Sequence, residues 1–98
     1  MAHGYRAGFI NMRTQINRGN NTIRKLINIW APASDSNNPE NYAKFVSSTS
    51  GIPIDAVIDP NDAASMQKIV SAMARMENGK DANAEDIAQG WKLYTGIA

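Results

Sequence analysis

The clearest structural signal lies in the stretch Thr22-Ile23-Arg24-Lys25-Leu26-Ile27-Asn28-Ile29-Trp30-Ala31-Pro32. Thr22 is a good N-cap, and apolar residues then recur at helical spacing as far as Trp30. Pro32 disfavours helical geometry at Ala31, so this helix is predicted to end near Trp30. A polar loop over residues 33–38 follows.

Helices are also predicted on both sides of this stretch. Before it, an apolar face ends at Gly19 and consists of Tyr5, Phe9, Met12 and Ile16. After it, Asn38 is predicted to cap a helix that has Pro39 in its first position and ends at Gly51. The inward face of that helix is formed by Tyr42, Phe45, Val46 and Thr49.

Two more helices are predicted towards the C-terminus. Asp59 followed by Pro60 is predicted to cap the first, which stops at Asn78-Gly79. Asn83 is predicted to cap the second, with Ile87, Trp91 and Tyr94 facing inward. Segment 52–58 contains a proline and is short, so we expect a packed connector or one helical turn there and no strand. The sequence thus predicts one all-α domain over residues 1–98, with about five helices in an orthogonal or bundle-like arrangement.

Composition excludes several classes of chemistry. The 98 residues include no cysteine and one histidine, His3. Disulfides, thiolate metal sites and a cysteine nucleophile are therefore excluded, and we expect no metal and no cofactor. Residues 1–12 lack the apolar core of a signal peptide, and no apolar run is long enough to span a bilayer. The expected location is the cytoplasm of a bacterial host or a virion.

The charges are unevenly distributed along the chain. The formal net charge is +1, but residues 1–30 contain no acid and five bases, which are Arg6, Arg13, Arg18, Arg24 and Lys25. The favoured interpretation is that basic helices pack beside acidic ones. The alternative is nucleic-acid binding through these bases, which requires that they share one exposed face. No nucleic-acid motif accompanies them, so this alternative ranks last.

Glu77 is the candidate for catalysis. It precedes Asn78-Gly79 at the predicted end of a helix, where the helix dipole disfavours a charged carboxylate. A protonated carboxyl group is what a general acid in sugar cleavage needs. The partner carboxylate is left open among Asp81, Asp35 and Glu40. The competing interpretation is a surface glutamate paired with Arg75 or Lys80.

Tryptophan and methionine residues fall on the predicted apolar faces. Sugar-binding sites use aromatic rings, but a tryptophan at helical spacing in a small domain is more often part of the core. Trp30 and Trp91 are therefore expected in the core. Core positions are likewise predicted for Met66, Met73 and Met76.

Several short motifs together resemble a family of phage and prophage proteins usually labelled virion structural proteins, some of them described as lysozyme-like. The motifs are Gly4-Tyr5-Arg6-Ala7, Asn21-Thr22-Ile23, Trp30-Ala31-Pro32, Asn38 with Tyr42, Gly51, and Glu77-Asn78-Gly79. They occur in the family's order over nearly the whole chain. The resemblance implies a virion structural protein whose partners are other virion proteins or peptidoglycan.

Two departures from the family qualify this resemblance. Ile29 stands where the family often has arginine. Family members also commonly carry an upstream segment resembling Asn-Pro-Gly-Asn, which this chain lacks, so it is expected to be a trimmed portion or a short member. If catalysis uses groups from that segment, this chain is inactive by itself.

These observations lead to a first hypothesis and two alternatives. The first is a phage-derived domain that serves as a structural or cell-wall-associated component, with a functional surface formed by Arg6, Arg13, Trp30, Tyr42 and Glu77. Arg6 has a purely structural alternative, which is to lock the first helix to the Trp30-Ala31-Pro32 turn. The enzyme alternative is a lysozyme-like peptidoglycan hydrolase with Glu77 as general acid, and it predicts a groove beside Glu77. Nucleic-acid association is the third.

Overall fold

The first three helices form where the sequence places their caps. In the computed structural model, which describes residues 2–30 and 38–96, they are α1 (Ala2–Asn17), α2 (Ile23–Trp30) and α3 (Pro39–Ser50). Lys25 N–H donates to Thr22 Oγ1 at 3.2 Å, and Glu40 N–H donates to Asn38 Oδ1 at 2.9 Å. Gly51 ends α3 with φ 77°, a conformation that costs glycine little. The capping predictions for α2 and α3 are confirmed.

The last two helices are α4 (Ala63–Asn78) and α5 (Ala84–Thr95). Asn83 caps α5 as predicted, because its Oδ1 accepts from Glu85 N–H at 2.8 Å. The prediction that Asp59 caps α4 is wrong. Asp62 is the cap and accepts from Ser65 N–H at 3.2 Å, whereas Asp59 holds the preceding turn by accepting from Asn61 N–H.

The Asp62 cap carries a testable pH dependence. Hydrogen bonds from Ser65 lower the pKa of Asp62, so the ionised carboxylate is favoured in the folded state. Its contribution to stability is present above the unfolded value of about 3.9 and is lost as pH falls through the lower folded pKa. We expect Asp62→Ala to lower Tm near neutral pH, and the difference from wild type to shrink below about pH 3. Asp59→Ala, measured alongside, should lower Tm less; an equal effect would contradict this assignment.

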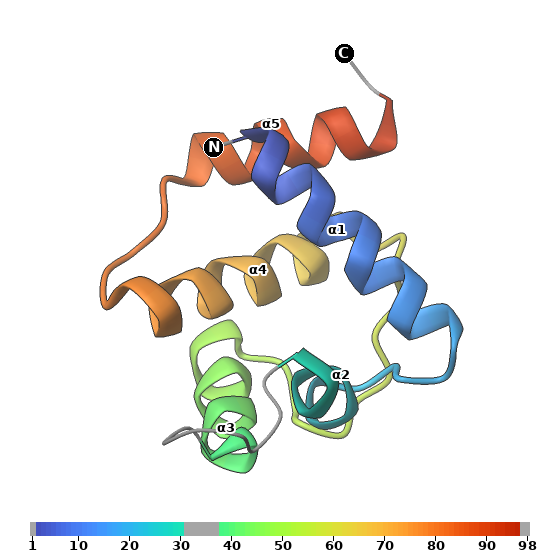
Figure 1. Ribbon diagram of the computed structural model, residues 1–98, viewed down its shortest axis with the longest axis vertical. Coiled ribbons are helices and arrows are strands. Elements are labelled where there is room, and N and C mark those ends of the chain that lie inside the picture. The colour runs from blue at the N-terminus through green and yellow to red at the C-terminus, as the bar shows by residue number, and fades with distance from the viewer. Residues whose placement is uncertain (1, 31–37, 97–98) are drawn as a thin grey trace.

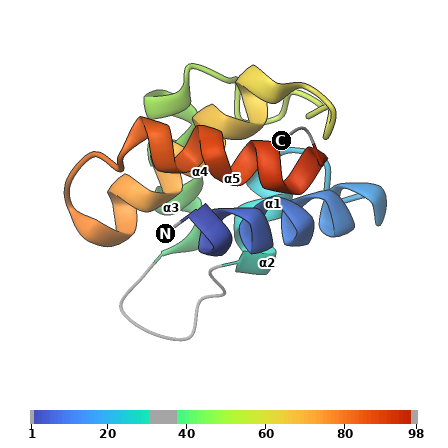
Figure 2. The ribbon, with the colours of Figure 1, turned by 90° about the horizontal axis from the view of Figure 1, so that it is seen from above.

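Helix α4 lies between two helix pairs. Figure 1 shows α1 and α5 on one side of α4 and α2 and α3 on the other, and α1 and α5 run beside each other when seen from above (Figure 2). The radius of gyration is 12.5 Å, about what a compact chain of this length has. The protein is therefore one small all-α domain of five described helices, as predicted.

One core connects all five helices. Its fully buried large side chains are Phe9, Met12, Ile23, Leu26, Ile27, Val46, Met66 and Ile69. Two predicted core positions are wrong: Thr49 is exposed while Ser50 is buried, and Met76 is 38% exposed at the end of α4. The connector 52–58 packs Ile58 into this core and contains no strand. No helix in the described ranges is both long and apolar enough to cross a membrane.

Candidate functional site

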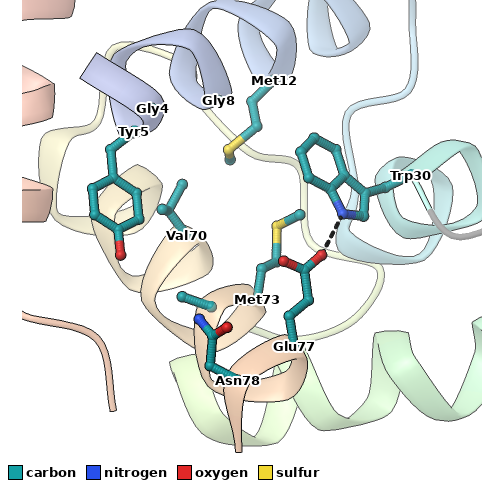
Figure 3. Close-up of a pocket in the computed structure, with 10 residues that line it drawn as sticks. Gly4, Tyr5, Gly8, Met12, Trp30, Val70, Met73, Glu77 and Asn78 are labelled. Atoms are coloured by element: carbon teal, nitrogen blue, oxygen red, sulfur yellow. Dashed lines mark hydrogen bonds between the residues drawn. The ribbon is translucent and has the colours of Figure 1, made fainter. Parts of the chain in front are cut away.

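A cavity of about 310 Å³ opens where α1, α4 and the end of α2 meet. Figure 3 shows Tyr5 on one side of it, Trp30 on the opposite side and Glu77 beside Trp30. Its walls are mainly apolar. The lining residues are Gly4, Tyr5, Gly8, Met12, Trp30, Val70, Met73, Ala74, Glu77 and Asn78.

Two glycines in α1 leave this space open. Gly4 and Gly8 are one helical turn apart, and a Cβ atom at either position would meet nothing within 4 Å. Neither has a positive φ, so the backbone does not require glycine there. Glycine inside a helix costs about 0.5–1 kcal/mol relative to alanine. Helix α1 therefore gives up stability at the two positions where side chains would enter the cavity.

Glu77 lies in the last turn of α4, close to the end of α2. Its Oε1 accepts from Trp30 Nε1–H at 3.2 Å and from the Tyr42 hydroxyl at 3.4 Å. Gly79 ends α4 just beyond it with φ 71°. Three helices thus meet at one carboxylate oxygen. Glu77 on α4 contributes the oxygen, and Trp30 on α2 and Tyr42 on α3 donate hydrogen bonds to it.

Trp30 corrects a prediction. It was expected in the core, but its side chain is 41% exposed. Helix α2 has eight residues, and its inward positions are filled by Ile23, Leu26 and Ile27. Trp30 therefore lies at the edge of the core, where it and Met12 line both the cavity and a second hollow beside Ile29.

Tyr42 belongs partly to the core and partly to the site. Its side chain is 4% exposed, and only its hydroxyl reaches Glu77. Burial, followed by the negative charge of Glu77 and the hydrogen bond to it, raises the pKa of Tyr42 well above its usual range. The hydroxyl therefore stays protonated and acts as a donor to the carboxylate.

Arg6 and Arg13 lie outside this cavity. Both are exposed on α1, and the guanidinium of Arg13 lies 5.2 Å from the centre of the Tyr94 ring, a cation–π contact with α5. The structure therefore brings together Trp30, Tyr42 and Glu77 from the predicted surface, but not the arginines. It adds Tyr5, which sequence reasoning assigned only to the apolar face of the first helix.

Two of the three candidate partner carboxylates, Asp81 and Glu40, do not line the cavity. Asp81 pairs with Arg75 at 2.8 Å, and Glu40 pairs with Arg24. Arg75 is thus engaged by Asp81. The competing interpretation required an ion pair of Glu77 with Arg75 or Lys80, and neither pair forms in the described part of the chain. Asp35 lies outside the described residues. Ala31 and Pro32 do too, so the predicted contact of Arg6 with the Trp30-Ala31-Pro32 turn stays a prediction. Within the described ranges, no three His, Cys, Asp or Glu side chains gather in a way that could hold a metal ion.

The five N-terminal bases do not form one uncommitted face. The Arg24 Nε–H donates to Asp55 at 2.9 Å, and its Nη1 bonds to Glu40. Arg24 therefore ties α2 to the connector and to the start of α3, and Arg13 lies on Tyr94. No contact here favours nucleic-acid binding, which stays an untested prediction.

A phage protein is similar to this chain. Protein P5 of Pseudoalteromonas phage PM2 is 38% identical over 96 residues, which cover 94% of this chain and 58% of that protein. The chain therefore spans a little more than half the length of the relative it matches. No family model and no solved structure matches the chain. The similarity supports the predicted phage origin.

Proposed function

We propose that this protein is a virion-associated structural component of a phage that acts at the host cell wall, and that it binds peptidoglycan in the cavity beside Glu77. Similarity to a phage protein over almost the whole chain supports the phage setting. The resemblance to virion structural proteins supports the structural role. The cavity supports binding, because it is apolar and holds few polar groups, as ligand sites commonly do.

The observation that carries this proposal is the pairing of Trp30 with Glu77. The indole is 41% exposed and is held in place by a hydrogen bond to the carboxylate. An aromatic face packs well on the carbon-bound hydrogens of a sugar or peptide, while a carboxylate accepts hydrogen bonds from its polar groups. Because the pair is already positioned, little ordering is needed on binding.

Truncation of Trp30 tests this function. In co-sedimentation with purified peptidoglycan sacculi, we expect Trp30→Ala to weaken binding at least about tenfold, the effect of losing a tryptophan hot spot worth about 2 kcal/mol. Leu93→Ala is the matched control, because Leu93 is similarly exposed, at 37%, and does not line the cavity. Wild-type protein that stays in the supernatant, or equal binding by Trp30→Ala, would refute the proposal.

A second candidate is peptidoglycan hydrolysis with Glu77 as general acid. The cavity beside Glu77 favours it, since this hypothesis predicts a groove there. One observation weakens it. Glycosidases usually pair two carboxylates, and neither Glu40 nor Asp81 lines the cavity.

Muropeptide release separates the two candidates. Purified peptidoglycan would be incubated with the chain, with Glu77→Gln, and with a version extended upstream, while turbidity and released fragments are followed. Release by the wild-type chain that Glu77→Gln abolishes would establish hydrolysis. Release by the extended version alone would make this chain part of an enzyme. Binding without release from either supports the structural role.

A further inference from the structure

We propose that the group bound in the cavity is an aliphatic ammonium, namely the side-chain amine of the diamino acid in the peptide stems of peptidoglycan. This inference rests on the proposed function and specifies the ligand of the same site. It follows from the charge, the wall chemistry and the size of the cavity.

The charge of the lining selects a cation. Among the described residues that line the cavity, Glu77 is the one ionisable acid or base besides the Tyr5 phenol, and none is an arginine or lysine. Glu77 also lies in the last turn of α4, where the helix dipole adds partial negative charge. An ammonium group is therefore attracted, a carboxylate or phosphate is repelled, and a neutral hydroxyl gains no charge–charge interaction.

One oxygen of Glu77 is available to such a ligand. Both hydrogen bonds from Trp30 and Tyr42 go to Oε1. Oε2 accepts none from the residues that the structure describes, and Figure 3 shows it on the side of the carboxylate that faces away from Trp30. A charge-assisted hydrogen bond from an ammonium group would fill this position, and such bonds are about twice as strong as neutral ones.

The walls suit an alkyl chain that ends in a cation. Tyr5 and Trp30 present rings from opposite sides, and an ammonium near an aromatic face gains cation–π attraction. Met12, Val70 and Met73 supply apolar surface for methylene groups. The volume of about 310 Å³ is at the lower end for small-molecule pockets, so it accommodates one side chain and not a run of sugar rings.

The first experiment compares two probes that differ in one group. The Trp30 indole N–H signal would be followed by NMR during titration with n-pentylamine at neutral pH, which is cationic, and with n-pentanol, which is neutral. The Trp30→Phe variant lacks the indole N–H at position 30, so its spectrum shows which of the two tryptophan signals belongs to Trp30 and which to Trp91. We expect n-pentylamine to shift it with a dissociation constant on the order of millimolar, and n-pentanol to bind at least about tenfold more weakly.

Glu77→Gln tests the source of this selectivity. It keeps a hydrogen-bond acceptor for Trp30 and removes the charge, so we expect amine binding to fall at least about tenfold and to approach that of n-pentanol. Glu85→Gln removes the same charge from an exposed position in the first turn of α5 and should bind like wild type. Equal affinities for the two probes, no shift with n-pentylamine, or an unchanged Glu77→Gln would overturn the inference.

Acetylated sacculi identify the source of the amine. Acetylation of the free amines removes the ammonium groups and leaves the glycan backbone in place, so we expect binding to sacculi to be lost. Retained binding to acetylated sacculi would refute the inference while leaving peptidoglycan binding intact. Shifts with n-pentylamine without binding to untreated sacculi would instead refute the proposed function and retain the ammonium selectivity of the cavity.

Discussion

Phe9→Ala should destabilise the fold more than any other single truncation proposed for this chain. Phe9 is 0% exposed, and its ring meets Trp91 edge-on at 5.1 Å and Tyr94 at 5.8 Å between ring centres. Truncating a buried phenylalanine costs about 3–5 kcal/mol, because apolar contacts are lost and a cavity remains. The total free energy of unfolding of a domain of this size is about 5–15 kcal/mol. We therefore expect the urea midpoint, followed by far-ultraviolet circular dichroism, to fall by roughly a fifth or more.

Phe9→Leu and Leu93→Ala provide the comparison for this result. Leucine retains much of the buried volume at position 9 and should cost less than alanine does. Leu93 is exposed on α5 and should change the free energy of unfolding by less than about 0.5 kcal/mol. A loss of under about 1 kcal/mol in Phe9→Ala would contradict the packing of α1 on α5 described here.

The helix boundaries could be predicted because their causes are local. Asn38, Gly51, Gly79 and Asn83 each act within one helical turn, so their signals are complete in the sequence. The start of α4 was less determined, because Asp59-Pro60 and Asp62 both carry capping signals within four residues. Asp62 prevails through its two hydrogen bonds with Ser65, which donates both its N–H and its hydroxyl.

The site was harder to predict than the helices. Trp30, Tyr42 and Glu77 are all candidates from the sequence, but Trp30 and Glu77 are 47 positions apart, and no local pattern shows that the ends of α2 and α4 meet. A groove beside Glu77 followed only from the hydrolase alternative. Hydrophobic periodicity does not reveal the cavity, because it reports only side chains that are present. The spacing of Gly4 and Gly8 was the available signal, since two glycines one turn apart mark a helix face that lacks side chains.

Gly8→Leu should separate binding from stability, with opposite effects on the two. Gly8 lines the cavity, and a Cβ there would meet nothing within 4 Å, so a leucine side chain has room to enter and occupy the space. Replacing a helix-interior glycine by a good helix former should raise the free energy of unfolding by about 0.5–1 kcal/mol. Binding to sacculi, and the response to n-pentylamine, should fall at least about tenfold because the ligand is excluded. Urea unfolding and co-sedimentation measure the two effects on the same protein.

The neighbouring position provides the matched control. Ala7 is exposed on α1 and does not line the cavity, so Ala7→Leu introduces the same side chain outside the site and should bind like wild type. Gly8→Ala should gain similar helix stability while filling less of the cavity, so its binding should lie between those of wild type and Gly8→Leu. A Gly8→Leu protein that is stable and binds as tightly as wild type would place the binding surface elsewhere. A stable protein that no longer binds would explain why α1 carries two glycines that its backbone does not need.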